Sequence, residues 1–295
     1  MVEVPGIADA LGIASLRVKD ERGRMGMGSF KALGASYVIA RHAEAGEAAG
    51  RTYVTASAGN HGLSVAAGAR VFGARSRVYL AETVPAGFAE RLRAEGAEVR
   101  VEGADYDASM AAAARYAEAE GLFLLSDSSW EGYDAPPRML MEGYLAMAAE
   151  MAEADAPDVL LLQAGVGGMA GAVAAYLRGR WPEAAICVVE PVAAPAVMAS
   201  IEASGMARGD GPDSVMGRLD CKEPSLIGLA GLSRDADWCL TVMDAAAERA
   251  AARLGAEGLA TTPSGAAGVA GLIAHAETLG LGPETCAMAI VTETA

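Results

Sequence analysis

The sequence is poor in lysine. Only three of its 295 residues are lysines, Lys19, Lys31 and Lys222, against twenty arginines. Arginine therefore carries most of the positive surface charge, and a lysine at Lys31, within the small and apolar stretch GMGSFKALGASY, suggests a role that arginine cannot fill. A lysine can lose its proton and become a nucleophilic amine, whereas a guanidinium stays protonated. Lys31 is therefore the first candidate for a reactive group.

The sequence also lacks positive net charge and paired cysteines. Its net charge of −15 disfavours a nucleic acid partner, because phosphates require a basic surface. Its cysteines form no C-x-x-C pair and have no histidine cluster beside them; they are Cys187, Cys221, Cys239 and Cys286. We therefore expect neither a zinc site nor a disulfide framework, nor any other metal, but free buried thiols in a cytoplasmic protein.

Targeting and membrane segments are not expected either. No charged and then apolar leader opens the chain, and no low-complexity linker interrupts it. One uncharged stretch, residues 159–177, is about as long as a membrane span. Its glutamine and four glycines instead predict a short buried strand, a glycine turn and a helix.

Apolar strand patterns alternate with helical patterns along most of the chain. The predicted strands are residues 51–57, 76–82, 97–103, 122–127, 158–165 and 185–191, and the helices between them include 62–73, 86–96 and 107–120. Such alternation predicts an α/β fold with parallel sheets and right-handed crossovers, with helices on both faces of each sheet.

Two glycine-rich turns follow predicted strands, where open α/β sheets bind ligands. In QAGVGGMAG, residues 163–171, small residues leave backbone amides free to approach an anion at the start of a helix. In TASAGNHG, residues 55–62, a hydroxyl, backbone amides and a carboxamide are available to bind the carboxylate or ring hydroxyl of a ligand. His61 in this turn is either a base or a structural histidine. A buried amine, a phosphate cradle and a carboxylate-binding turn together suggest pyridoxal 5'-phosphate (PLP).

Six motifs occur in the order found in the fold-type II PLP enzymes, which the chain resembles from about residue 6 to its end. They are GSFKALGASY, SAGNHG, AERLRAEGAEVRV, QAGVGGMAG, VVEP and PSGAAG. RMGMGSFKALGASY, DSSWEGYDAPPRMLMEGY and QAGVGGMAGAVAAYL look most like diaminopropionate ammonia-lyase, with serine/threonine dehydratases next. The resemblance implies two open, twisted, mostly parallel sheets with the site between two domains. We expect residues 1–45 and 140–295 to form a larger PLP-binding domain, and 46–139 a smaller substrate-side domain.

The resemblance also implies a role for each matching residue. Lys31 matches the lysine that bonds to the cofactor, and Asn60 the asparagine at its ring oxygen. The phosphate loop corresponds to Gly165, Val166, Gly167, Gly168 and Met169. The turn that holds the substrate carboxylate corresponds to Ser57, Ala58, Gly59, Asn60 and His61. Asp127 matches an acidic residue near the substrate amine, with Glu131 the second candidate, and Thr292 or Thr294 a hydroxyl opposite the pyridine nitrogen.

The implied reaction is α,β-elimination of a β-substituted amino acid, with 2,3-diaminopropionate favoured, to a 2-oxo acid and ammonia. The family also implies a homodimer. Diaminopropionate ammonia-lyases usually have an aspartate at the position of Ala58, where the dehydratases have alanine, so the sequence does not decide between D- and L-substrates. The chain opens on VPGIADALG and stops at TETA, which suggests a compact variant. A hydroxyamino-acid dehydratase for serine, threonine or 3-hydroxyaspartate, a β-replacement synthase and a silent PLP-binding protein remain alternatives.

Overall fold

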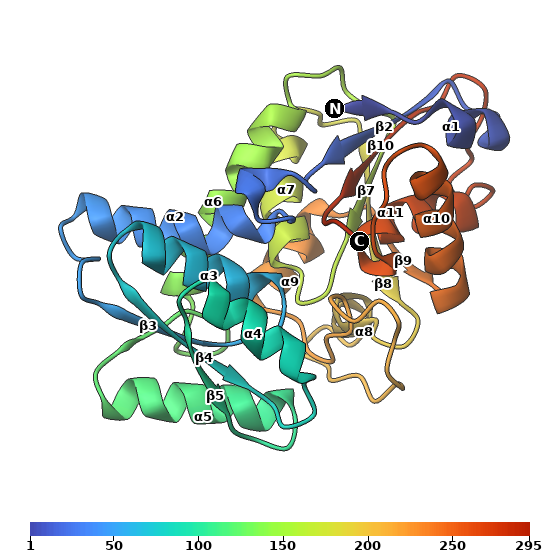
Figure 1. Ribbon diagram of the computed structural model, residues 1–295. Helices are drawn as coiled ribbons and strands as arrows, with labels where there is room; N and C mark the ends of the chain where they lie inside the picture. Colours follow the sequence, from blue (N-terminus) through green and yellow to red (C-terminus); the bar gives the residue numbers. More distant parts are fainter.

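The strands form two separate sheets (Figure 1) in the computed structural model, which describes residues 1–295. The larger sheet has the order β1-β2-β10-β7-β8-β9, and the smaller one β5-β4-β3-β6. The strands of the larger sheet are β1 (Val2–Glu3), β2 (Ser15–Asp20), β7 (Val159–Gln163), β8 (Ala185–Pro191), β9 (Trp238–Val242) and β10 (Cys286–Val291). Those of the smaller sheet are β3 (Thr52–Ala56), β4 (Arg75–Leu80), β5 (Glu98–Val101) and β6 (Phe123–Leu124).

Twelve helical segments connect and cover these strands. They are α1 (Pro5–Leu11), the 3₁₀ turn η1 (Arg24–Gly26), α2 (Lys31–Glu44), α3 (Asn60–Val71), α4 (Ala86–Ala94), α5 (Tyr106–Ala119), α6 (Ala135–Met151), α7 (Gly168–Arg178), α8 (Ala196–Glu202), α9 (Leu226–Asp235), α10 (Asp244–Ala256) and α11 (Pro263–Ala274). Side-chain caps begin two of them: Asp105 accepts a hydrogen bond from the Ala108 amide before α5, and Thr262 accepts one from Gly265 before α11.

The larger sheet is buried on both faces, and all its strand pairs except β1–β2 are parallel. Successive side chains of β7 enter different cores, because strand residues alternate between faces. Leu160 and Leu162 pack with α2, α6, α7 and α9, whereas Val159 and Leu161 pack with α1, α10 and α11. Each of these two cores is continuous and apolar, so the sheet is a rigid base for the loops at the carboxyl ends of its strands.

The smaller sheet is entirely parallel and has the same layered arrangement. One core places Val78 and Leu80 of β4 against α3 and α4, and another places Val54 and Ala56 of β3 against α5. In both sheets, ends of the parallel strands lie near α2 and α3 (Figure 1).

Helices α2 and α6 pack closely because glycines lie where they meet. A Cβ atom placed on Gly34 would lie 2.8 Å from Leu140, and one on Gly143 only 2.4 Å from the carbonyl oxygen of Leu33. Real side chains do not approach this closely, so these glycines set the distance between the helices. Since α2 begins at Lys31, the same contact positions that lysine.

The structure confirms the α/β fold with two mostly parallel sheets flanked by helices. Residues 159–177 form β7, a glycine turn and most of α7, as the glutamine and glycines indicate. No helix is both long and apolar enough to cross a membrane. The division into domains at residues 45 and 140 stays a prediction.

Replacing Gly143 should destabilise the protein. The Gly143→Ala methyl group would meet the Leu33 carbonyl oxygen at 2.4 Å and Tyr37 at 2.8 Å, so α2 and α6 would have to separate. We expect a loss of about 1–3 kcal/mol in the free energy of unfolding, measured by urea denaturation. Gly255→Ala is the matched control, because no atom lies within 4 Å of its added methyl group. It should be neutral or stabilise by up to about 1 kcal/mol, and equal losses in both variants would contradict the packing argument.

Candidate functional site

Lys31 is the first residue of α2 and forms an ion pair with Asp127. The distance from Lys31 Nζ to Asp127 Oδ2 is 2.5 Å, and the two side chains are only 22% and 17% exposed. Asp127 follows β6 of the smaller sheet, so the pair joins the start of α2 to the carboxyl end of that sheet. The ring of Phe30 lies under the amine, with its centre 5.3 Å from Nζ.

The pair shifts the pKa values of both partners. Burial is the largest single influence on Lys31 and lowers its pKa, but the charge and hydrogen bond of Asp127, together with Tyr144 and Cys221, raise the pKa above its ordinary value. Burial likewise raises the pKa of Asp127, but the charge and hydrogen bond of Lys31, together with smaller contributions from its surroundings, hold that pKa well below its usual range. Without a ligand, Lys31 is therefore protonated at neutral pH.

The glycine-rich loop between β7 and α7 lies beside this pair. Gly167 has φ +88°, a left-handed conformation that favours glycine. A Cβ atom on Gly165 would lie 3.0 Å from the thiol of Cys221, and one on Gly168 would lie 3.7 Å from the Asp127 carbonyl oxygen. The backbone amides from Gly167 through Met169 to residue 170 donate to no acceptor in the protein. The loop is thus a bare cradle of amides at the positive end of a helix.

The turn between β3 and α3 is the second predicted ligand loop. A Cβ atom on Gly62 would lie 2.3 Å from the Ser57 carbonyl oxygen, so this glycine permits the tight entry into α3. The hydroxyl of Ser57 accepts a hydrogen bond from the amide of Gly59 at 3.2 Å. Ala58 is half-buried and packs against the apolar core under α3 and α4. The tight turn holds the serine and the helix start in fixed positions.

His61 is buried within this turn. Its Nε2 donates to the carbonyl oxygen of Leu125 at 2.9 Å, while Nδ1 has no partner. Burial lowers its pKa, so the imidazole is neutral. This environment is typical of a structural histidine, and the predicted contact of His61 with substrate stays a prediction.

Asn60 contacts a residue that the sequence motifs did not identify, the buried Glu293. Asn60 Nδ2 donates to Glu293 Oε2 at 2.5 Å, and Arg218 Nε lies 2.8 Å from the same oxygen. The hydroxyl of Thr262 donates to Oε1 of this carboxylate. Glu293 lies between the two threonines considered for the pyridine nitrogen, and the only signal in the sequence is an acidic residue two positions after an apolar strand.

The two threonines have different surroundings. Thr292 is buried, with its hydroxyl 3.5 Å from Nε2 of Gln163, whereas Thr294 is exposed and its amide donates to the Gly28 carbonyl oxygen at 2.9 Å. The amide of Phe30 donates to the Thr292 carbonyl oxygen. The chain after β10 is thus bonded to the segment that leads into α2. Which threonine faces the cofactor nitrogen stays a prediction.

The segment after Asp127 includes the second acidic candidate. Glu131 is exposed and makes no ion pair or hydrogen bond, so the structure does not bring it to Lys31 as it brings Asp127. The rings of Trp130 and Tyr133 stack with their centres 4.3 Å apart. The Tyr133 hydroxyl donates to the carbonyl oxygen of Leu124, which stabilises this loop.

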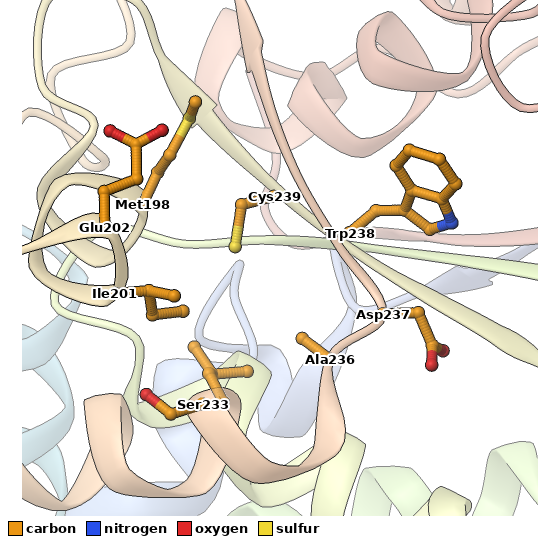
Figure 2. Close-up of a pocket in the computed structure, with 9 residues that line it drawn as sticks. Met198, Ile201, Glu202, Ser233, Ala236, Asp237, Trp238 and Cys239 are labelled. Carbon is orange, nitrogen blue, oxygen red and sulfur yellow. The ribbon is translucent and has the colours of Figure 1, made fainter. Parts of the chain in front are cut away.

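A separate cavity of about 240 Å³ lies between α8, α9 and the start of β9 (Figure 2). It is lined by residues such as Ile201, Leu232 and Trp238, and by none of the predicted site residues. Elsewhere, no group of three or more metal-ligating side chains gathers, and all four cysteines are free.

Comparison with known proteins identifies the family. The profile described as pyridoxal-phosphate dependent enzyme matches residues 1–293. The chain therefore belongs to the family of pyridoxal-phosphate dependent enzymes.

Three curated relatives are similar over most of the chain. Diaminopropionate ammonia-lyase of Salmonella typhimurium is 33% identical over 269 residues, which cover 81% of this chain and 66% of the relative. The Escherichia coli enzyme is 29% identical, with 82% and 67% covered. The biosynthetic L-threonine dehydratase of Mycobacterium bovis is 30% identical, with 83% and 57% covered. The chain thus spans about two thirds of the length of the ammonia-lyases, and less of the dehydratase.

Solved structures of diaminopropionate ammonia-lyase and threonine deaminase are also similar to this chain. Escherichia coli diaminopropionate ammonia-lyase in complex with an aminoacrylate–PLP reaction intermediate superimposes with a TM-score of 0.90 at 28% identity, covering 99% of this chain and 83% of that one. Its complex with D-serine gives 0.88 at 28% identity, with the same coverage. Threonine deaminase of Solanum lycopersicum gives 0.90 at 22% identity, covering 99% and 82%, which supports the fold alone.

The residues around Lys31 fit PLP. The amine of Lys31 suits the cofactor aldehyde, and the unbonded backbone amides from Gly167 to residue 170 suit its phosphate. No acidic residue lies in the first turn of α7 to repel a phosphate. The half-buried carboxamide of Asn60 offers a neutral donor for the ring. The chain thus supplies an amine, an anion site and a polar ring contact in one place.

The Lys31–Asp127 pair predicts how the cofactor-free protein responds to Asp127→Asn. Removing the carboxylate leaves the buried charge of Lys31 unpaired, and we expect a loss of about 3 kcal/mol at pH 6 in urea unfolding. Burial then lowers the folded-state pKa of Lys31 below its unfolded value of 10.5. Between the lowered folded-state pKa and 10.5, the unfolded state binds more protons than the folded state. The free energy of unfolding of the variant therefore rises with pH across this range, toward that of the wild type.

Asp134→Asn is the matched control, because Asp134 pairs with Arg138 at the surface, where both side chains are more than half exposed. It should change the unfolding free energy by less than about 1 kcal/mol at every pH. A variant at Asp127 that unfolds like this control at pH 6 would show that the Lys31–Asp127 pair is not coupled as described.

Proposed function

We propose that the protein catalyses α,β-elimination of a small β-substituted amino acid, 2,3-diaminopropionate in the first place, to a 2-oxo acid and ammonia. The observation that carries the proposal is the Lys31–Asp127 pair beside the glycine loop. The similarity to two diaminopropionate ammonia-lyases over four fifths of the chain supports it. Bound PLP would supply an aldehyde that bonds to amines and a ring that accepts electrons from the substrate Cα.

The chain's own residues hold the reacting groups. Amides of the loop from Gly165 to Met169, at the start of α7, would hold the cofactor phosphate. The turn from Ser57 to His61 would hold the substrate carboxylate, since its amides and the Ser57 hydroxyl lie at the start of α3. Thr292 or Thr294 would place a neutral hydroxyl near the pyridine nitrogen. These contacts orient the substrate before any proton moves.

Lys31 would take the proton from the substrate Cα. Its amine is a general base only when neutral, and the charge of Asp127 opposes this in the ligand-free protein. A substrate ammonium that pairs with Asp127 would neutralise that charge, and burial would then lower the pKa of Lys31. Lys31 would release its proton to solvent when it bonds to the cofactor aldehyde, and a substrate cation at Asp127 would then favour the freed amine in its neutral, basic form.

Asp127 would also select a second amine on the substrate. A buried carboxylate suits an ammonium better than a hydroxyl, because an unpaired charge in such a site is costly. This favours 2,3-diaminopropionate over serine. Glu131, which is exposed, is the weaker candidate for this contact. The β-amine would leave as ammonia, and hydrolysis of the remaining enamine would release a 2-oxo acid and a second ammonia.

A hydroxyamino-acid dehydratase is the second candidate. Ala58 favours it, since serine/threonine dehydratases resemble this sequence at that position, and a threonine dehydratase is 30% identical. The chemistry at Lys31 would be the same, with water as the leaving group. A homodimer follows from the family resemblance and a cytoplasmic location from the unpaired cysteines, and both stay predictions.

Products from a panel of L- and D-amino acids test the proposal. With L-2,3-diaminopropionate we expect two ammonia molecules for each 2-oxo acid, and with serine only one, measured by enzymatic assays of both products. Turnover of hydroxy substrates alone would favour the dehydratase, and steady release without an added nucleophile would contradict a β-replacement synthase. Lys31→Ala should lose about 10³-fold or more in kcat.

Lys31→Arg is the control for charge. It keeps a cation opposite Asp127, and with it the ion pair, but it cannot act as a base or bond to an aldehyde. It should fold with a stability near that of the wild type and be as inactive as Lys31→Ala. Full activity of either variant would refute the assignment of Lys31.

Asp127→Asn tests substrate selection separately. Both substrates lose kcat if Asp127 tunes Lys31, but only the diamino substrate loses a charge partner. We expect KM for L-2,3-diaminopropionate to rise roughly tenfold or more, and KM for L-serine to change much less, in steady-state kinetics. Equal changes in both KM values would remove Asp127 from substrate selection.

A further inference from the structure

Glu293 is a buried carboxylate at which three other parts of the chain meet. It is 3% exposed and follows β10 by two residues. Its oxygens contact Asn60 at the start of α3, Arg218 in the loop before α9, and Thr262 at the start of α11. The smaller and larger sheets are therefore connected through one side chain beside the candidate site.

Both oxygens of the Glu293 carboxylate have partners in the protein. Burial raises the pKa of Glu293, and Arg218, Thr262 and Asn60 oppose that rise. Oε1 accepts the Thr262 hydroxyl, and Oε2 receives both the Asn60 amide and the Arg218 guanidinium. A buried carboxylate with donors on both oxygens cannot rotate freely, because any rotation breaks a charge-assisted bond.

Asn60 is the partner that reaches the candidate site. It lies one turn before Ser64, whose hydroxyl donates to the carbonyl oxygen of Lys31 at 2.8 Å. A carboxamide nitrogen has two N–H groups, and Glu293 accepts only one of them. The other N–H of Asn60 and its carbonyl oxygen have no partner in the protein. The bond to Glu293 also settles which end of the carboxamide is nitrogen.

We propose that Glu293, held by Arg218 and Thr262, is a positioning residue that orients the Asn60 carboxamide so that its free N–H faces the ring of the bound cofactor. The inference rests on the proposed cofactor contact of Asn60 and adds a supporting residue to it. A carboxylate that only tied the two sheets together would stabilise the fold without affecting the cofactor. The two roles predict different results.

The test compares holoenzymes of Glu293→Ala, Asn60→Ala and the double variant. The readouts are the visible absorption band of bound PLP and the rate at which PLP is lost on dilution. We expect each single variant to shift the band in the same direction and to lose PLP about tenfold faster. The double variant should also lose it about tenfold faster, rather than a hundredfold, because the two residues act as one unit.

Conservative and control variants keep the test decisive. Glu293→Gln retains an oxygen that can accept from Asn60 and should lose PLP within about threefold of the wild-type rate. Glu190→Gln removes an equally buried carboxylate of the larger sheet, bonded to the amides of Val197 and Met198, and should leave the absorption band and the rate of PLP loss unchanged.

If Glu293→Ala does not fold, Arg218→Met weakens the cluster from its exposed side. It should speed PLP loss by about threefold, and not at all in the Asn60→Ala background.

Two results would overturn the proposal. One is a Glu293→Ala protein with a lower melting temperature but the wild-type band and rate, which would leave Glu293 a structural residue only. The other is an additive double variant, about a hundredfold faster in PLP loss, which would make the two contacts independent. These readouts do not need turnover. A protein that binds PLP and shows the coupling, yet eliminates from no amino acid, would contradict the proposed function and leave this inference intact.

Discussion

The ion pair between Lys31 and Asp127 is the interaction on which the candidate site depends. It holds a lysine at the start of α2 against a carboxylate that follows β6, with 2.5 Å between the charged atoms. Most proteins avoid burying such charges unless each is compensated. Here each charge compensates the other, so the amine stays protonated in the ligand-free protein. The same contact joins the start of α2 to the smaller sheet.

The backbone around this pair is held by close packing more than by polar contacts. Gly34 and Gly143 let α2 and α6 approach, and Gly62 lets α3 begin directly after its turn. The tail after β10 is bonded to the segment before Lys31 through Phe30. Each of these contacts limits the freedom of one loop at the site, so the reactive side chains are fixed by the apolar cores of both sheets.

The chain covers only 66% and 67% of the length of the two curated ammonia-lyases. The superposition on the Escherichia coli ammonia-lyase structure covers 99% of this chain and 83% of that structure. The identity of 28% is spread over a backbone that superimposes with a TM-score of 0.90. Ala58, packed against the apolar core beneath α3, marks where the chain departs from the ammonia-lyase pattern.

Local sequence determined the strands, the helices and the two glycine loops. The largely apolar strands β3, β4, β7 and β8, of five to seven residues, form close to the predicted limits, because burial on both faces favours apolar side chains. The scarcity of lysine singled out Lys31, and the glycines after strands located the cradle. The predicted strand at 122–127 is shorter in the structure, where only residues 123–124 pair with β3.

Tertiary structure alone decided which side chains meet. The pairing of Lys31 with Asp127 spans 96 residues, and that of Asn60 with Glu293 spans 233, so no local pattern contains either contact. Asp127 was assigned to the site by resemblance, whereas Glu293 went unrecognised because an acidic residue after a strand usually faces water. Its burial depends on Arg218 and Thr262, which reach it only when both sheets are folded. Sequence specifies the elements through short-range burial and backbone preference, whereas long-range packing selects the partners of their charges.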